Sequence, residues 1–193
     1  MTGCTLGGIG AATAGILAGK ARMDVVCAGR TLRKLEVCAA HIRATYPNAT
    51  LTCLVLDVSS FESVRAFVAA FEAAYPPAAR PLALLVNNAG IMAAPYATSI
   101  DGWELQMATN HLGPFLLSCL LAPRLRAAAH ACPALGSRVV NVASMAHALP
   151  FPYGPKPLPL NQKYRNANGP KFFAYGRCVV KGKWLLLFGS KRG

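Results

Sequence analysis

The sequence predicts an α/β fold in which helices cover both faces of a doubly wound parallel sheet. Short apolar runs rich in β-branched residues alternate with longer stretches rich in alanine and leucine, which is the pattern of buried parallel strands joined by crossover helices. The composition agrees, because 54% of the 193 residues are apolar and 14% are charged. One globular domain with a sizeable core is therefore expected.

The strands and helices can be placed in chain order. Four apolar runs are the predicted strands, at 23–29, 50–58, 82–88 and 137–144. The stretches before and between them predict helices near 9–20, 31–46, 60–75 and 101–130. At the third helix, the motif SSFE predicts Ser59 as the N-cap and Glu62 as its capping-box partner. Proline, glycine and asparagine at 150–170 predict a long loop.

No membrane-spanning segment is predicted. The most apolar stretch, 111–125, is broken by Pro114, Pro123 and Arg124, so that no apolar run approaches the ~20 residues that a bilayer requires. The start of the chain carries no charged region followed by an apolar block, so no secretory signal is predicted. The seven cysteines never take C-x-x-C spacing and are expected to be reduced core thiols. We therefore expect an intracellular protein, cytoplasmic by default, with the organelle left open.

The charge is uneven along the chain. The net charge is +13, and residues 105–193 carry twelve lysines and arginines but no acidic residue. A basic half can bind nucleic acid or an anionic surface, but these cations are scattered and lack the interleaved aromatic residues of a nucleic-acid module. Nucleic-acid binding is therefore disfavoured. The four histidines lack metal-ligand spacing, and no metal site is predicted.

A glycine-rich turn precedes the first predicted helix, in TGCTLGGIG. Such a turn lets backbone amides approach a phosphate at a helix N-terminus, although the spacing is neither G-x-G-x-x-G nor a Walker loop. An ordinary loop before a helix remains the alternative for the turn by itself. Polar residues also follow each strand, and ligands of parallel sheets bind at the carboxyl ends of strands. These residues are Arg30, Asp57, the NNAG motif at 87–90, and Ser144.

Taken together, the motifs resemble the short-chain dehydrogenase/reductase family. They are TG…GIG, a DV pair at 57–58, NNAG, NHLG at 110–113, VVNVAS ending at Ser144, and AYG at 174–176, in the family's order. The chain is most similar to the retinol-dehydrogenase-like members around RVVNVASMAH and FFAYG. The resemblance covers about residues 2–178 and implies a partial NAD(P)-binding Rossmann domain over 1–178, followed by a divergent tail over 179–193.

The resemblance also implies roles for individual residues. The glycine turn would hold the cofactor pyrophosphate through Thr2, Gly3, Gly8, Ile9 and Gly10. The adenosine part of the cofactor would lie against Asp57, Val58, Asn87, Ala89 and Gly90. Ser144 would polarise a substrate carbonyl, Tyr175 would exchange the proton, and Asn110 would support a relay water. An alcohol or carbonyl compound would be the substrate, and the helices near 101–130 would mediate any self-association.

The choice of cofactor can be predicted from the residues themselves. An acidic residue about 20 positions past the glycines favours NAD, whereas a cation there favours the 2′-phosphate of NADP. Counting from Gly10 leads to Arg30, with Arg33 nearby, while Asp24 stands at the wrong end of its strand. NADP(H) is therefore preferred over NAD(H). The alternative is that Arg30 is only a solvated charge at a strand end.

Three departures from the family pattern stand out. The glycine turn is one residue longer than T-G-x-x-x-G-x-G, so that Gly7 or Gly8 is an insertion. The central strand that should lead into Gly3 and the C-terminal strands are missing, which predicts an incomplete sheet and low stability for a chain of this extent. The position four residues after Tyr175, where the family has lysine, holds Val179; Lys181 and Lys183 are out of register with it.

These observations leave three functions to weigh. The first is an NAD(P)(H)-dependent oxidoreductase that interconverts an alcohol and a carbonyl, impaired in this chain by loss of the lysine. The second is a non-catalytic module that binds a nucleotide or dimerises with a complete partner. The third is a basic protein that binds nucleic acid or anionic lipid through residues 124–192.

Overall fold

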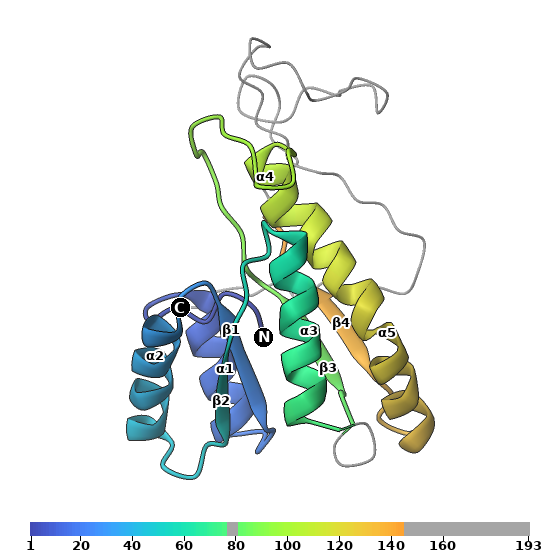
Figure 1. Ribbon diagram of the computed structural model, residues 1–193. Helices are drawn as coiled ribbons and strands as arrows, with labels where there is room; N and C mark the ends of the chain where they lie inside the picture. The colour runs from blue at the N-terminus through green and yellow to red at the C-terminus, as the bar shows by residue number, and fades with distance from the viewer. Residues whose placement is uncertain (77–80, 145–193) are drawn as a thin grey trace.

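The computed structural model describes residues 1–76 and 81–144 (Figure 1). In chain order, the elements are α1 (Ile9–Gly19), β1 (Val25–Gly29), α2 (Leu32–Thr45), β2 (Leu51–Val55), α3 (Phe61–Ala74), β3 (Leu84–Asn87), α4 (Leu105–Met107), the π-helix η1 (Ala108–Leu112), α5 (Gly113–Ala131) and β4 (Arg138–Asn141). Every strand and helix predicted within these residues is present, with bounds that differ by a few residues; the helix predicted near 101–130 consists of α4, η1 and α5. The loop predicted at 150–170, Tyr175 and Val179 lie outside the described residues.

The strands form two parallel pairs. β1 pairs with β2, with Val25 opposite Leu51, and β3 pairs with β4, with Leu84 opposite Arg138. The first three residues, Met1–Gly3, lie between the two pairs and are called the terminal staple here. Hydrogen bonds join the staple to both neighbours, and the spatial order is β2, β1, staple, β3, β4.

Three backbone hydrogen bonds show how the staple joins the pairs. On the β1 side, the Ala28 N–H donates to the Met1 carbonyl at 2.9 Å, and the Gly3 N–H donates to the Ala28 carbonyl at 2.8 Å. On the β3 side, the Thr2 N–H donates to the Val86 carbonyl at 3.0 Å. The staple therefore occupies the position of a central strand, but only at the carboxyl end of the sheet.

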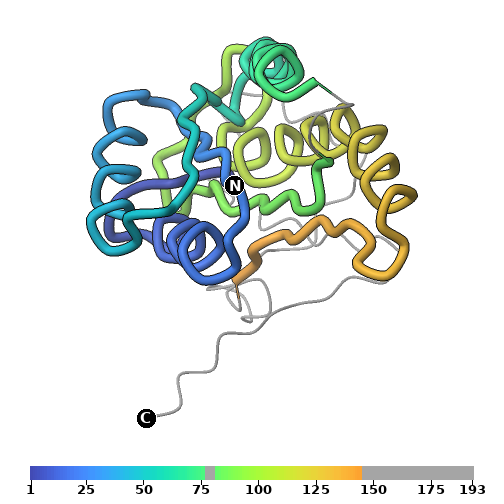
Figure 2. Tube along the Cα trace, turned by 90° about the horizontal axis from the view of Figure 1, so that it is seen from below, coloured from blue at the N-terminus to red at the C-terminus, as the bar shows by residue number. Residues whose placement is uncertain are grey.

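Two apolar cores lie on opposite faces of the sheet, as the doubly wound prediction requires. Viewed from below in Figure 2, α1 and α2 lie on one side of the strands, and α3 and α5 on the other. The core under α1 and α2 includes Cys4, Ala14, Cys27, Leu35, Cys38, Ile42 and Leu51. The core under α3 and α5 includes Ala28, Leu56, Val64, Phe67, Phe71, Leu85, Leu117 and Leu121.

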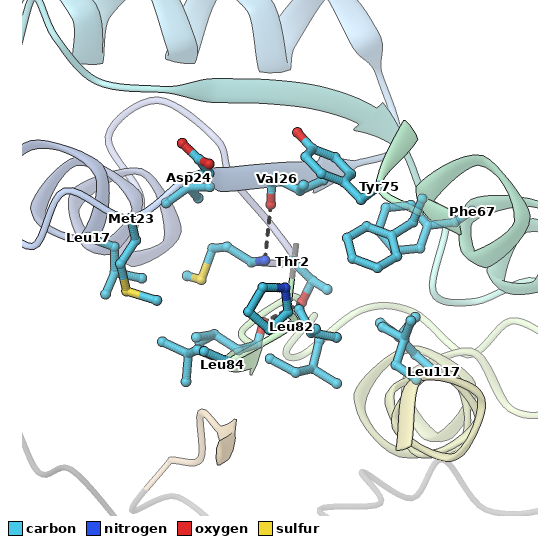
Figure 3. Close-up of a pocket in the computed structure, with 18 residues that line it drawn as sticks. Thr2, Leu17, Met23, Asp24, Val26, Phe67, Tyr75, Leu82, Leu84 and Leu117 are labelled. Atoms are coloured by element: carbon cyan, nitrogen blue, oxygen red, sulfur yellow. Dashed lines mark hydrogen bonds between the residues drawn. The ribbon is translucent and has the colours of Figure 1, made fainter. Parts of the chain in front are cut away.

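Below the staple, the edges of β1 and β3 enclose an apolar cavity of about 400 Å³, called the seam slot here. Figure 3 shows Leu17 and Met23 at one side of it, and Phe67 and Leu117 at the other. Val26 and Leu84 line the slot from the two strands. The seam slot continues the line of the staple between the two strand pairs, where the strand expected to lead into Gly3 would run.

The predicted capping box of α3 was wrong. The N-cap is Ser60, whose Oγ accepts a hydrogen bond from the Ser63 N–H at 3.2 Å. Ser59 instead donates to the Asp57 carboxylate from both its N–H, at 2.9 Å, and its hydroxyl, at 2.7 Å. Because Asp57 holds Ser59 in a turn, the helix starts one residue later, and Glu62 is one position short of a capping-box partner.

The stretch 111–125 is helical despite its two prolines, in agreement with the helix predicted near 101–130. Pro114 lies in the first turn of α5, directly after the π-helix η1, and Pro123 lies inside α5. Packing of Leu117, Leu121 and Leu125 into the second core compensates for the bond that Pro123 removes. Within the described residues, Leu105–Ala131 is long and apolar enough to span a membrane by length and composition.

Arg124 shows how α5 is held to the protein. Its guanidinium donates to the Tyr75 carbonyl at 2.7 Å and lies 5.3 Å from the centre of the Phe71 ring. Arg124 is only 5% exposed, and these two contacts compensate for the burial of its positive charge. Arg124 thereby anchors α5 against the end of α3.

Candidate functional site

The glycine turn, the start of α1 and the NNAG motif pack in direct contact at the carboxyl end of the sheet. Gly3 has a φ of +72°, and a Cβ there would lie 2.9 Å from the Ala89 Cα. A Cβ on Gly10 would overlap the Gly3 carbonyl oxygen and would lie 2.8 Å from the Asn88 Nδ2. These two positions therefore admit only glycine without a shift of the backbone.

The additional residue of the glycine turn forms an exposed bend. The Gly8 N–H donates to the Thr5 carbonyl at 2.9 Å, and Gly7 has a φ of +81° with open space around it. Gly8 is the N-cap of α1 and offers no capping side chain, while Ile9 is 68% exposed. The first amides of α1 lack intrahelical partners, as in any helix, and amides in this position can bind an anion.

Thr2 and Asn88 lock the staple onto the end of β3. The Thr2 Oγ1 accepts hydrogen bonds from the backbone N–H groups of Asn88 and Ala89, both at 3.0 Å. The Asn88 side chain donates back to the Thr2 carbonyl at 2.9 Å and to the Gly3 carbonyl at 3.3 Å. Thr2 is 2% exposed, so its side chain is buried within this clamp.

Asn87, the last residue of β3, forms side-chain hydrogen bonds to two neighbouring elements. Its Nδ2 donates to the Asn141 Oδ1 at 2.8 Å and to the Ser118 Oγ at 3.0 Å. Its own Oδ1 is buried and has no hydrogen-bond partner among the described residues. Asn87 thus ties β3 to β4 and to α5 rather than pointing out of the site.

Asn110 holds the loop that follows NNAG. Its Oδ1 accepts from the Ile91 N–H and its Nδ2 donates to the Ile91 carbonyl, both at 2.8 Å. It lies in the π-helix η1, a type of helix that is frequent at functional sites. A Cβ on Gly90 would lie 3.3 Å from the Asn110 Oδ1, so the glycine allows this close approach.

The other predicted cofactor residues line the same end of the sheet. Arg30 directly follows β1 and is exposed, as is Arg33. Asp57 is half-buried, and its carboxylate is engaged by Ser59, while Val58 is buried. The Val58 carbonyl contacts Gly113, where a side chain would overlap it, so the start of α5 is drawn against this loop.

The predicted catalytic residues are described only in part. Ser144 follows β4 and is exposed, at the same end of the sheet as Asn110. Tyr175, Val179 and the two lysines lie outside the described residues. The structure therefore brings together the predicted nucleotide-binding residues and leaves the pairing of Ser144 with Tyr175 as a prediction.

Sequence reasoning missed the role of Asn88. The NNAG motif drew attention to Asn87, Ala89 and Gly90, yet Asn88 makes the two hydrogen bonds that fix the glycine turn. Its partner Thr2 was predicted to contact the cofactor itself. A signal was available, since an asparagine directly after a buried strand and beside glycines commonly hydrogen-bonds neighbouring backbone.

A pair of thiols lies directly under the glycine turn. Cys4 and Cys27 are fully buried, as the prediction of core thiols requires, whereas Cys119 and Cys132 on the other side of the molecule are exposed. A hydrogen bond with Cys4, together with burial, raises the pKa of the Cys27 thiol far above its usual range. Cys27 therefore stays protonated and acts as packing beneath the site.

Comparison with known proteins gives the relatives of this chain. Residues 1–156 match the short chain dehydrogenase family. Human retinol dehydrogenase 12 is 42% identical over 141 residues, which are 72% of this chain and 41% of that protein. The chloroplastic short-chain dehydrogenase TIC 32 A of Brassica napus is 40% identical over 147 residues, which are 76% of this chain and 44% of that protein. The chain spans less than half the length of these curated relatives.

The fold has solved counterparts as well. A metagenomic short-chain oxidoreductase, crystallised in complex with NADP, superposes with a TM-score of 0.61 at 29% identity, covering 79% of this chain and 64% of that one. The glycine turn, the NNAG clamp and the match over residues 1–156 lead to one conclusion: the chain belongs to the short chain dehydrogenase family, among its retinol-dehydrogenase-like members.

Proposed function

We propose that the carboxyl end of the sheet binds NADP(H) and that the protein interconverts an alcohol and a carbonyl compound. The observation that carries this proposal is the Thr2–Asn88 clamp, which holds the glycine turn open at the start of α1. Amides at the first turn of α1 would receive the pyrophosphate. The exposed Arg30 guanidinium would pair with the 2′-phosphate, which NAD lacks.

The residues of this chain would divide the chemistry as follows. NADP(H), when bound, supplies or accepts the hydride. Ser144 would donate a hydrogen bond to the substrate carbonyl oxygen, and Tyr175 would deliver the proton to the same oxygen during reduction. Asn110 would keep the loop at Ile91 in place beside the substrate. A tyrosine titrates near pKa ~10, so Tyr175 needs a neighbouring cation to work at neutral pH.

Val179 weakens catalysis on this proposal. The residue four positions after a helical tyrosine lies on the same face one turn away, and valine supplies no ammonium there. We expect slow turnover by this chain and a gain of at least about tenfold in Val179→Lys, measured as NADPH oxidation with a panel of aldehydes and ketones. Equal turnover by the unmodified chain and Val179→Lys would mean that a lysine at this position does not promote catalysis. That result would favour the second candidate, a non-catalytic nucleotide-binding module.

Cofactor binding can be tested without turnover. Calorimetric titration should show that NADPH binds more tightly than NADH. Arg30→Glu should lower NADPH affinity at least about tenfold and leave NADH affinity nearly unchanged. Arg65→Glu on the exposed face of α3 is the matched control and should bind both cofactors as the unmodified chain does. Equal losses of NADPH affinity in Arg30→Glu and Arg65→Glu would mean that Arg30 acts only through the net charge of the protein.

Self-association through 101–130 stays a prediction. One face of α5 packs on α3, while Phe115 is 57% exposed and stacks on His111 at a ring-centre distance of 6.2 Å. That pair would be the centre of the interface. Sedimentation velocity of the unmodified chain and of Phe115→Ser would test it, with dissociation expected only in the variant.

The predicted cytoplasmic location also stays a prediction, since the word chloroplastic describes one relative and not this chain.

A further inference from the structure

Three polar side chains form a hydrogen-bonded chain between α5 and the sheet. The Asn87 Nδ2 donates to the Ser118 Oγ at 3.0 Å and to the Asn141 Oδ1 at 2.8 Å. The Ser118 hydroxyl in turn donates to the Pro114 carbonyl, one turn earlier in α5, at 2.7 Å. Ser118, Asn87 and Asn141, called the polar bridge here, therefore connect α5, β3 and β4 (Figure 1).

The polar bridge lies beside apolar residues of the second core. Leu117 and Leu121 of α5 belong to the same core cluster as Leu85 of β3. Asn87 is only 5% exposed, and Ser118 is half-buried. Buried polar groups stabilise a fold only when they are paired with good geometry, whereas apolar contacts are not directional. The bridge therefore fixes the position of α5 on the sheet more narrowly than the leucines beside it.

Ser118 determines which way the Asn87 amide faces. A serine hydroxyl has one proton, and that of Ser118 is donated to the Pro114 carbonyl. Toward Asn87 the hydroxyl can therefore offer only a lone pair, which pairs with the Nδ2 group and not with the Oδ1. The Asn87 Oδ1 is left buried without a hydrogen-bond partner among the described residues, and this lowers stability. The amide keeps its orientation in spite of that cost.

Asn87 also holds the end of β4, which Ser144 follows. Its carbonyl accepts a hydrogen bond from the Val142 N–H at 2.9 Å, and its side chain holds that of Asn141. Asn87 and Asn141 are register partners in the parallel pair, so their side chains lie on the same face of the sheet, toward α5. Two hydrogen bonds from one residue thus fix the chain just before Ser144.

The other end of the polar bridge holds the helix that carries Asn110. The π-helix η1 continues directly into α5, so Asn110 and Ser118 lie about two turns apart on one continuous helix. Pro114 lies between them and accepts the Ser118 proton. The bridge therefore connects the helix that carries Asn110 to the strand end that precedes Ser144.

We propose that Ser118 is a positioning residue that sets the distance between Asn110 and Ser144. It acts through Asn87, whose amide it holds between α5 and the end of β4. This inference rests on the proposed function, in which Asn110 holds the loop beside the substrate and Ser144 binds the substrate carbonyl. Without the Ser118 hydroxyl, the Asn87 amide can turn, and the end of β4 loses its fixed position relative to α5.

Hydrogen exchange tests this role without turnover. In Ser118→Ala, the Val142 amide should exchange at least about fivefold faster, whereas Ser118→Thr, which keeps the hydroxyl, should retain most of the protection. Cys119→Ala, at the neighbouring exposed position of α5, is the matched control and should leave exchange at Val142 unchanged. Unchanged exchange at Val142 in Ser118→Ala, or equal acceleration in Cys119→Ala, would overturn the proposal.

Turnover then separates positioning from support of the fold. In the Val179→Lys background, Ser118→Ala should lower kcat for aldehyde reduction at least about tenfold and leave the NADPH Kd, measured by calorimetry, unchanged. Ser118→Thr should recover most of the kcat. An unchanged kcat in Ser118→Ala, or an equal loss in Ser118→Thr, would show that the hydroxyl does not position the site and would overturn the proposal. If Val179→Lys itself has no activity, the proposed function fails, and exchange at Val142 still decides whether Ser118 fixes the strand end.

Discussion

The boundary between β1 and β3, called the seam here, is closed by polar contacts at the carboxyl end of the sheet. At the amino end of the sheet, the same boundary is apolar and hollow. At the closed end, Thr2 and Asn88 exchange hydrogen bonds between the staple and β3. At the hollow end, Val26 and Leu84 face each other across the seam slot. This difference shows that the two strand pairs are joined by specific hydrogen bonds at one end, whereas at the other end apolar side chains of both strands face a cavity.

The largest effect should come from removing space at the closed end. Gly10→Ala would place a methyl group on the Gly3 carbonyl oxygen, and backbone cannot give way as a flexible side chain can. We expect a loss of about 3 kcal/mol in the free energy of unfolding, measured with urea. Gly7→Asn is the matched control, because Gly7 has open space and a positive φ that asparagine tolerates. A small loss in both variants would mean that the closed end is not tightly packed.

A second effect should come from the clamp itself. Thr2→Val keeps the shape of the side chain but leaves the N–H groups of Asn88 and Ala89 without their acceptor. Leaving these half-buried donors without an acceptor should lower the free energy of unfolding by about 2 kcal/mol, measured by chemical denaturation. Thr5→Val in the exposed part of the same turn should change it very little. Equal stability of the two variants would show that the clamp contributes nothing.

A smaller effect is expected at the edge of the site. Asn110→Ala removes both hydrogen bonds to Ile91 in an exposed loop, which should cost about 1 kcal/mol locally. Hydrogen exchange of the Ile91 amide should accelerate about fivefold, while amides in β1 keep their rates. Unchanged exchange at Ile91 would mean that the loop is held by other contacts.

The smallest effect concerns pH at the junction of the two ends. Burial lowers the pKa of the Met1 α-amino group from its usual 8.0, although the group donates to the Val26 carbonyl at 3.1 Å. The unfolded chain therefore binds this proton more readily, so stability should be highest above pH ~8 and should decline as the pH falls toward the lowered pKa. Urea unfolding between pH 6.5 and 8.5 should show this slope. N-terminal acetylation should abolish the slope, and a slope that persists would implicate another group.

Sequence patterns predicted much of the fold because its elements depend on local periodicity. The four strands and the long helices followed from apolar runs, and Arg30, Asp57 and NNAG pointed to the carboxyl end of the sheet. The start of α3 was misplaced because the side chain of Asp57 competed for Ser59. The helix predicted near 101–130 is present although Pro123 removes one helical hydrogen bond, because α5 also packs into the second core.

The contacts across the seam could not be predicted in the same way. Asn88 and Thr2 are 86 positions apart, and their reciprocal hydrogen bonds depend on how the two strand pairs meet. The sequence identified Thr2 as a family position and assigned it to the cofactor. Only the three-dimensional arrangement shows its side chain buried against β3, where a hydroxyl oxygen is the acceptor that two adjacent amides require.

Hydrogen exchange of the unmodified chain with and without saturating NADPH tests the central claim most directly, that the closed end of the seam is the nucleotide site. We predict that amides of Gly3–Gly10 and of Asn88–Ile91 become at least about tenfold more protected, while those of Leu82–Leu85 beside the seam slot change little. Unchanged exchange at the glycine turn under saturating NADPH, or protection confined to the slot, would contradict the account.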